Sequence, residues 1–222
     1  METGDTFRKG KAMDNLIISF SGRKNGNCDQ IGQYIASAGS GNDKVVRFRE
    51  LNAHPCCGCE YECFGGVCKY REDDVYSLYG EMCRYDRVIL IVPMYCGNPA
   101  SLYFIFHERC QDYFSHNESR YEEVVKRLYI IGVYGKAETF PDFVPCLEKW
   151  FEGSGYSGRV LGIERHLYGQ KIGDRVLQAP AGACRRQMTE LNGMMRSWRN
   201  WELPMSRGRN WRNAIGRQCM TI

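Results

Sequence analysis

A polar loop near the start of the sequence contains residue types that bind phosphate. Residues 16–20 form an apolar run typical of a buried strand, and residues 21–28 read Ser-Gly-Arg-Lys-Asn-Gly-Asn-Cys. Apolar residues then recur at helical spacing, so the loop leads into a helix N-terminus, whose N–H groups and dipole favour an anion. An arginine in such a loop can pair with a phosphate through two N–H groups. The candidate phosphate contacts are Ser21, Arg23, Asn25, Asn27 and Cys28.

The loop differs from the two common nucleotide-binding motifs. It lacks the Gly-Lys-Ser/Thr ending that holds a triphosphate and Mg²⁺, and the spacing of Gly22 and Gly26 does not fit the three-glycine dinucleotide fingerprint. The loop therefore suits a single phosphate monoester. The alternative is an ordinary strand-to-helix turn that is capped by Asn27.

A second loop has the composition of a site for a flat ring. Residues 93–98 read Pro-Met-Tyr-Cys-Gly-Asn and follow the clearest apolar run, Arg87–Val92. An aromatic side chain can stack on a planar heterocycle, glycine permits close approach of the backbone, and an asparagine amide can bond the edge of the ring. The alternative is that Met94 and Tyr95 pack on a neighbouring helix.

Apolar runs alternate with helical patterns along the chain, which is typical of a doubly wound parallel α/β sheet. The expected strands cover residues 15–20, 44–50, 87–92, 127–133 and 158–163; the expected helices cover 27–38, 143–151 and 181–198 and also begin near Asp73 and Pro99. Ligands of such sheets bind beyond the carboxyl ends of the strands. The loops 21–28, 93–98 and 134–136 should therefore share one edge, and a phosphate site beside a flat-ring site suggests FMN.

Both loops resemble those of the NAD(P)H-dependent FMN reductase family. Members of that family typically read Gly-Ser-Pro-Arg-Lys-x-Gly-Asn-Thr where residues 20–28 lie here, and Pro-Met-Tyr-x-Gly-Asn-Pro-Ala-Ser at residues 93–101 resembles the family's second flavin loop. Three positions depart from the first pattern, namely Phe20 for Gly, Gly22 for Pro and Cys28 for Thr. The resemblance implies a flavodoxin-like fold with a five-stranded parallel sheet.

The resemblance also implies where the cofactor contacts the chain. Ser21, Arg23, Asn27 and Cys28 would surround the FMN phosphate, with Asn25 in the same loop. The ribityl chain and the isoalloxazine ring would face Pro93, Met94, Tyr95, Gly97 and Asn98. The nicotinamide of the co-substrate is expected near Tyr95 and Tyr134.

The implied activity is that of an FMN-dependent oxidoreductase, which transfers electrons from NAD(P)H to an unidentified acceptor. The implied assembly is a homodimer or a homotetramer. The alternative is a flavoprotein that carries electrons without converting a substrate of its own. Shuttle flavodoxins are strongly acidic, whereas here residues 1–183 have a formal net charge of about −2 and the C-terminal region is basic, which disfavours that alternative.

Five of the twelve cysteines fall between Cys56 and Cys68. Their spacing resembles the cluster-binding segment of the iron–sulfur flavoproteins, except that Glu62 occupies the third ligand position and Cys63 lies one residue later. A [4Fe-4S] cluster would then bind four thiolates, which are those of Cys56, Cys59, Cys63 and Cys68. The alternatives are zinc on the same thiolates, or a loop with thiols and no metal.

The composition and the charge distribution indicate a cytoplasmic protein with one main domain. The 222 residues contain no apolar run long enough to span a bilayer, and the polar leader 1–14 lacks a secretory signal. We assign residues 15–200 to the FMN-binding domain, with a cysteine-rich loop over 52–70, and 201–222 to a basic extension. Positive charge is concentrated near the C-terminus. We expect this basic segment to pack over the domain or over a neighbouring subunit, and binding to nucleic acid is the less favoured alternative.

Overall fold

The structure, a computed structural model, describes residues 12–39, 41–65, 68–115, 117–135, 142–156 and 159–164. Most of the predicted leader, the predicted helix over 181–198 and the basic extension 201–222 lie outside these ranges. In the part of the chain that is described, no helix is both long enough and apolar enough to cross a membrane.

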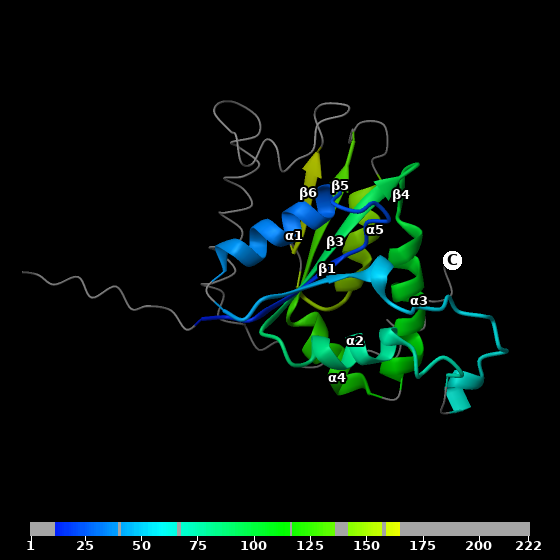
Figure 1. Ribbon diagram of the computed structural model, residues 1–222. Coiled ribbons are helices and arrows are strands. Elements are labelled where there is room, and N and C mark those ends of the chain that lie inside the picture. The colour runs from blue at the N-terminus through cyan, green and yellow to red at the C-terminus, as the bar shows by residue number, and fades with distance from the viewer. Residues whose placement is uncertain are drawn as a thin grey trace, which may run out of the picture.

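The centre of the fold is a parallel sheet whose strand order is β2-β1-β3-β5-β6. Its strands are β1 (Asn15–Ser19), β2 (Lys44–Arg47), β3 (Arg87–Tyr95), β5 (Leu128–Tyr134) and β6 (Val160–Glu164). A two-residue strand, β4 (Asn98–Pro99), pairs antiparallel with the end of β3. The predicted five-stranded doubly wound sheet is therefore confirmed, with β4 as an addition (Figure 1).

Helices cover both faces of this sheet. One face is covered by α1 (Asn27–Ala38), which crosses in front of the strands in Figure 1. The opposite face packs against α2 (Asp74–Met82), α3 (Ser101–Ser115), α4 (Glu118–Val125) and α5 (Phe143–Glu148). Short 3₁₀ turns cover Phe48–Glu50, Glu62–Gly65 and Lys149–Phe151. Because both faces are covered, the central strands read as continuous apolar runs.

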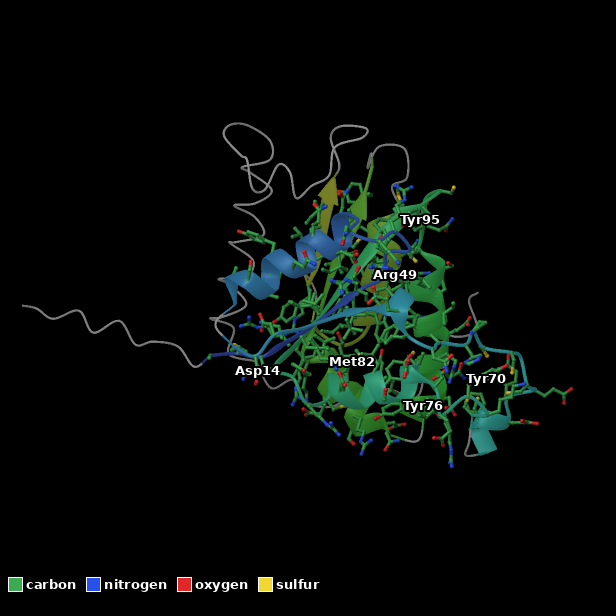
Figure 2. All side chains as sticks on the ribbon, viewed as in Figure 1. Asp14, Arg49, Tyr70, Tyr76, Met82 and Tyr95 are labelled. Atoms are coloured by element: carbon green, nitrogen blue, oxygen red, sulfur yellow. The ribbon has the colours of Figure 1, made fainter. Side chains whose placement is uncertain are left out.

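The third strand is longer than the sequence predicts. It was expected to end before Pro93, yet β3 continues through Pro93 to Tyr95 (Figure 2). The carbonyl of Ile91 points towards β1, where it accepts a hydrogen bond from the N–H of Phe20. Backbone orientation along a strand repeats every two residues, so the nitrogen of Pro93 points to the same side. Strand β1 has ended at that level, so the missing N–H of proline removes no ladder bond.

Other element boundaries also differ from the prediction. The second strand ends at Arg47, because Phe48 turns into the core within a 3₁₀ turn. The helix expected over 143–151 divides into α5 and a 3₁₀ turn, and helix α4 was not predicted at all. Pro99 lies in β4 instead of in the first turn of the next helix, which begins at Ser101.

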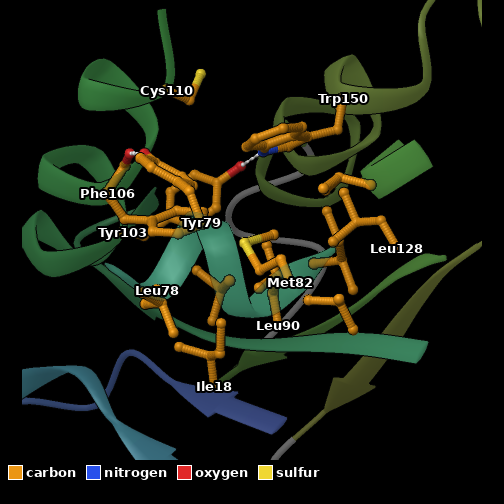
Figure 3. Packing of buried hydrophobic residues seen from close by; sticks show 14 of the residues in the cluster. Ile18, Leu78, Tyr79, Met82, Leu90, Tyr103, Phe106, Cys110, Leu128 and Trp150 are labelled. Carbon is orange, nitrogen blue, oxygen red and sulfur yellow. Dashed lines mark hydrogen bonds between the residues drawn. The ribbon is translucent and has the colours of Figure 1, made fainter. Parts of the chain in front are cut away.

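Alternate residues of each strand supply two separate hydrophobic cores. Ile17, Ile89 and Ile131 face α1, whereas Leu16, Leu90 and Leu128 face the larger set of helices. The larger core is rich in aromatic rings: Tyr79 donates a hydrogen bond to the carbonyl of Phe106, and Trp150 donates one to Tyr103 Oη at 2.7 Å (Figure 3). Each fully buried apolar side chain contributes about 1.5–3 kcal/mol relative to its exposed state.

We predict that His107 makes the fold acid-sensitive. Its ring lies against Tyr103 and Trp150, and burial, followed by the charge of Lys149, lowers its pKa to about 4. The folded-state pKa lies below the unfolded value of about 6.5, so the unfolded state takes up the proton more readily. The free energy of unfolding should therefore fall as the pH drops from about 6.5 towards 4, by up to about 3 kcal/mol.

Urea unfolding of the native chain and of His107→Phe at several pH values between 7.5 and 4.5 measures this effect. The phenylalanine keeps ring packing and cannot take up a proton, so the variant should lose less stability on acidification than the native chain does. Equal pH dependence of the two proteins would exclude His107 as the cause.

Candidate functional site

The first predicted loop connects the buried strand β1 to helix α1. Ser21 is buried, whereas Arg23, Lys24 and Asn25 are exposed. The hydroxyl of Ser21 accepts a hydrogen bond from the backbone N–H of Arg23 at 3.2 Å, which bends the loop back on itself. The predicted cap by Asn27 is wrong: Asn27 is the first helical residue, and the N-cap position is Gly26, without a side-chain cap.

A buried acid that the sequence analysis missed lies directly below this loop. Asp29, in the first turn of α1, is only 1% exposed. Its carboxylate accepts hydrogen bonds from the hydroxyl of Ser19 at 2.7 Å and from the backbone N–H of Asn25 at 3.0 Å. An acid in a first helical turn is usually read as a helix-dipole interaction, so the sequence alone gave no signal for this role.

The charge of Asp29 is balanced by Arg49, which lies just after strand β2. The guanidinium approaches the two carboxylate oxygens at 3.0 and 2.9 Å and also donates to the carbonyl of Ser21 at 3.2 Å. Hydrogen bonding to Asp29 raises the pKa of Arg49 above its usual value, which keeps the guanidinium charged.

The second predicted loop is a tight hairpin between β3 and β4. Met94 pairs with Pro99 and Tyr95 pairs with Asn98, so only two residues form the turn. Cys96 and Gly97 have φ angles of 49° and 85°, and type I′ hairpin turns require positive φ at both central positions. Met94 packs against the core, whereas Tyr95 is 39% exposed. The packing alternative therefore applies to Met94 and not to Tyr95.

The two loops meet at the carboxyl edge of the sheet. The guanidinium carbon of Arg23 lies 6.0 Å from the centre of the Tyr95 ring, at the outer limit of a cation–π contact. Figure 2 places Tyr95 and Arg49 in the same part of the molecule, far from Tyr70. The candidate phosphate contact and the candidate ring contact are thus close enough to contact one small molecule.

Two further candidate residues are directed elsewhere in the structure. Burial, and then the charge of Asp29, raises the pKa of the Cys28 thiol, which packs in the core below α1, so Cys28 can offer a bound anion only its backbone. The ring of Tyr134 contacts Phe143 edge-on and lies over Gly162, which turns it towards α5 and β6.

The cysteine-rich loop is anchored by a buried ion pair. Arg109 of α3 contacts Asp73 at 2.7 Å, and both side chains are 2% exposed. Arg109 also donates to the carbonyls of His54 and Tyr70, near the two ends of the loop, at 2.9 and 3.0 Å. Asp73 additionally caps α2 by accepting a hydrogen bond from the N–H of Val75. The base of the loop is therefore fixed to α2 and α3.

The thiols of this loop do not form a metal site in the structure. Among the residues that are described, which include all four predicted ligands, no group of three or more His, Cys, Asp or Glu side chains is arranged to hold a metal ion. Cys56 is exposed, Cys59 and Cys63 are partly exposed and Cys68 is buried. The predicted ligand set of a [4Fe-4S] cluster thus has no support from the geometry.

Comparison with known proteins gives structural matches only. No protein family model matches the chain, and no curated protein matches its sequence. An FMN-dependent NADH-azoreductase from Bacillus anthracis strain Ames Ancestor, in complex with FMN, is similar with a TM-score of 0.53 and 11% identity, over 84% of this chain and 100% of the other.

Two further solved structures show the same likeness. The Trp repressor binding protein from Bacillus subtilis has a TM-score of 0.52 and 16% identity, over 73% of this chain and 94% of the other. FerB from Paracoccus denitrificans, a flavoenzyme NAD(P)H:(acceptor) oxidoreductase, has a TM-score of 0.50 and 10% identity, over 85% and 96%. At such identities the likeness establishes the fold, and we conclude that this chain has a flavodoxin-like fold.

Two glycines of the first loop should respond differently to a methyl group. A Cβ on Gly22 would meet no atom within 4 Å, and its φ is not left-handed. Gly22→Ala should therefore raise the free energy of unfolding by about 0.4–1 kcal/mol, because the unfolded chain loses freedom. A Cβ on Gly26 would lie 3.0 Å from Ser21 Oγ and 3.3 Å from the carbonyl of Arg23.

Gly26→Ala should consequently lower the free energy of unfolding, and urea denaturation of both variants measures the difference. The two substitutions are matched in chemistry and lie in the same loop. An equal change in the free energy of unfolding for the two variants would show that the close packing around Gly26 does not affect stability.

Proposed function

We propose that this protein is an FMN-dependent oxidoreductase that takes electrons from NAD(P)H. The observation that carries the proposal is the approach of Arg23 to Tyr95, which joins a loop suited to phosphate to a hairpin suited to a flat ring. Both lie beyond the carboxyl ends of adjacent parallel strands, where sheets of this kind bind their ligands.

The residues at this edge fit FMN in charge and in shape. The exposed side chains of Arg23 and Lys24 offer positive charge to the phosphate, and Asp29, the buried acid below the loop, is paired with Arg49. Tyr95 is one of three large hydrophobic side chains that are exposed among the described residues, as expected of a surface on which a ring stacks. The tight turn at Gly97 leaves the backbone open to close approach.

Each residue then has a defined task. Arg23 binds the phosphate together with the N-terminus of α1, and the buried hydroxyl of Ser21, which hydrogen-bonds the N–H and the carbonyl of Arg23, shapes the loop around it. Tyr95 orients the ring, Asn98 offers its amide to the ring edge, and Met94 and Pro93 support the hairpin from the protein side. When FMN is bound, it supplies the hydride acceptor, and the chain contributes orientation, electrostatics and access.

The named activities of two similar structures support the proposal. One is an FMN-dependent NADH-azoreductase in complex with FMN, and the other is a flavoenzyme that transfers electrons from NAD(P)H to an acceptor. The electron acceptor of this chain stays unidentified. The role of Tyr134 beside the nicotinamide and the assembly into a homodimer or homotetramer stay predictions.

Binding of FMN to the purified protein tests the site. We expect Arg23→Gln to raise the dissociation constant for FMN by about tenfold or more, because a charge-assisted contact to the phosphate is lost. The affinity for riboflavin, which lacks the phosphate, should stay the same. Quenching of flavin fluorescence measures both affinities.

Lys24→Gln is the matched control, because it removes the same charge from the neighbouring exposed residue. It should weaken FMN binding less than Arg23→Gln does. If the native chain binds no FMN, or if FMN-loaded protein oxidises neither NADH nor NADPH with quinone, azo and ferric acceptors, the oxidoreductase proposal is wrong. Reduction by a partner protein alone would favour the electron-carrier alternative.

The cysteine-rich loop is not needed for this proposed chemistry. The N–H of Cys56 donates to Glu108 in the middle of α3, whereas the hairpin lies just before the first residue of that helix. Glu108 lies seven positions after Ser101 along the helix, which corresponds to a rise of about 10 Å. We therefore expect Cys59→Ser/Cys63→Ser to bind FMN and to oxidise NAD(P)H within about twofold of the native rate.

A [4Fe-4S] cluster on Cys56, Cys59, Cys63 and Cys68 stays a prediction from resemblance. Iron, zinc and acid-labile sulfide assays of anaerobically purified protein separate it from the zinc and metal-free alternatives. A large loss of NAD(P)H oxidation in the double serine variant would contradict our expectation that the cysteine-rich loop is not needed at the FMN site.

A further inference from the structure

A buried ion pair lies below the loop that we assign to the FMN phosphate. We propose that Asp29 and Arg49 are positioning residues, which hold this loop in the one shape that binds a phosphate monoester. The inference rests on the proposed FMN site. It assigns neither residue to direct contact with the cofactor.

The carboxylate of Asp29 connects three segments of the chain. One oxygen accepts from the Ser19 hydroxyl at 2.7 Å and from Arg49 Nη1 at 3.0 Å. The other oxygen accepts from the N–H of Asn25 at 3.0 Å and lies 2.9 Å from Arg49 Nη2. The guanidinium therefore meets the carboxylate through two parallel contacts, the geometry that fixes orientation best.

The pair fixes the phosphate loop near both of its ends. Arg49 Nη1 donates to the carbonyl of Ser21 at 3.2 Å, and Asp29 receives the N–H of Asn25. Asn25 has a left-handed φ of 53°, a conformation that costs free energy. The hydrogen bond from its N–H to Asp29 offsets part of that cost. Residues 22–24, which include Arg23, are the exposed part of the loop between these two attachments.

The pair is almost completely shielded from water. The side chain of Asp29 is 1% exposed and that of Arg49 is 11% exposed, and the neighbouring Arg47 lies 4.0 Å from the same carboxylate. A buried carboxylate is stable only while its hydrogen bonds are made. The loop therefore cannot leave this arrangement without breaking the hydrogen bond from Asn25 to the buried acid and the one from Arg49 to Ser21.

The charge of Asp29 makes the proposal sharply testable. A carboxylate close to a phosphate opposes anion binding, so a purely electrostatic account expects Asp29→Asn to tighten FMN binding. The positioning account expects the opposite, because asparagine cannot accept hydrogen bonds from both Arg49 nitrogens. The two accounts thus differ in the sign of the effect.

The experiment measures dissociation constants of FMN and riboflavin by fluorescence quenching. We expect Asp29→Asn to weaken FMN binding by about tenfold or more, whereas riboflavin binding changes by less than about twofold. The double variant Asp29→Asn/Arg49→Gln has the same net charge as the native chain. It should also bind FMN weakly, and bulk charge cannot explain that loss.

Two further variants serve as controls. Lys44→Gln removes an exposed ion pair with Glu81 from the opposite end of β2 and should leave both affinities unchanged. Ser19→Ala removes no charge; it removes the hydrogen bond to Asp29 and a longer one, at 3.5 Å, that the hydroxyl accepts from the N–H of Ser21, and it should weaken FMN binding by about threefold. If Asp29→Asn does not fold, Ser19→Ala takes its place in the measurement of FMN and riboflavin affinity.

Hydrogen exchange of the apo protein gives a readout that does not depend on flavin. The backbone amide of Asn25 should exchange faster in Asp29→Asn or Ser19→Ala than in the native chain. Native protein that binds no FMN, with an Asn25 amide that is protected, would refute the proposed function and leave the loop geometry intact.

Three results would overturn the positioning proposal itself. The first is tighter or unchanged FMN binding by Asp29→Asn. The second is an equal loss of FMN and riboflavin affinity, which would indicate a general effect on the fold. The third is an unchanged exchange rate at Asn25 in all variants.

Discussion

The carboxylate of Asp29 is the constraint on which the candidate site depends. It is buried at the first turn of α1, and it receives hydrogen bonds from the end of β1, from the loop after β1 and from the segment after β2. An ionised group in the interior is tolerated only with such partners, so the packing of the three segments and the shape of the loop are coupled. The same contacts that stabilise the acid therefore also hold the loop after β1 in its shape.

The hairpin that faces this loop is also fixed by local geometry. Two residues with positive φ close the turn, and the only proline in β3 lies where the neighbouring strand has already ended. Both loops are held by hydrogen bonds within the chain, and a site that is preorganised in this way loses less free energy on binding. The contact between Arg23 and Tyr95 thus joins two loops that are each held by hydrogen bonds of their own.

Much of this arrangement could be predicted because it follows from strand order. Continuous apolar runs revealed the central strands, and the edge rule for parallel sheets brought two distant loops together. The pairing of Asp29 with Arg49 could not be predicted, since it depends on the register that sets Ser19 beside Arg47. The sequence pattern also predicted wrongly that β3 ends before Pro93, because a proline usually interrupts the hydrogen bonds of a central strand. Only the length of the neighbouring strand β1 shows that no hydrogen bond is lost there.

The departure of Phe20 from the family pattern has a structural explanation. Its ring is fully buried and packs on Phe48, Tyr103 and Phe106, which ties the start of the loop after β1 to α3. Residue 20 therefore contributes to the core and leaves the loop backbone in place, so the departure does not argue against phosphate binding. The same helix anchors the cysteine-rich loop through Arg109, three residues beyond Phe106. That loop is therefore connected to the candidate flavin edge in two ways, through α3 and through the short chain segment that runs from Arg49 to Asn52.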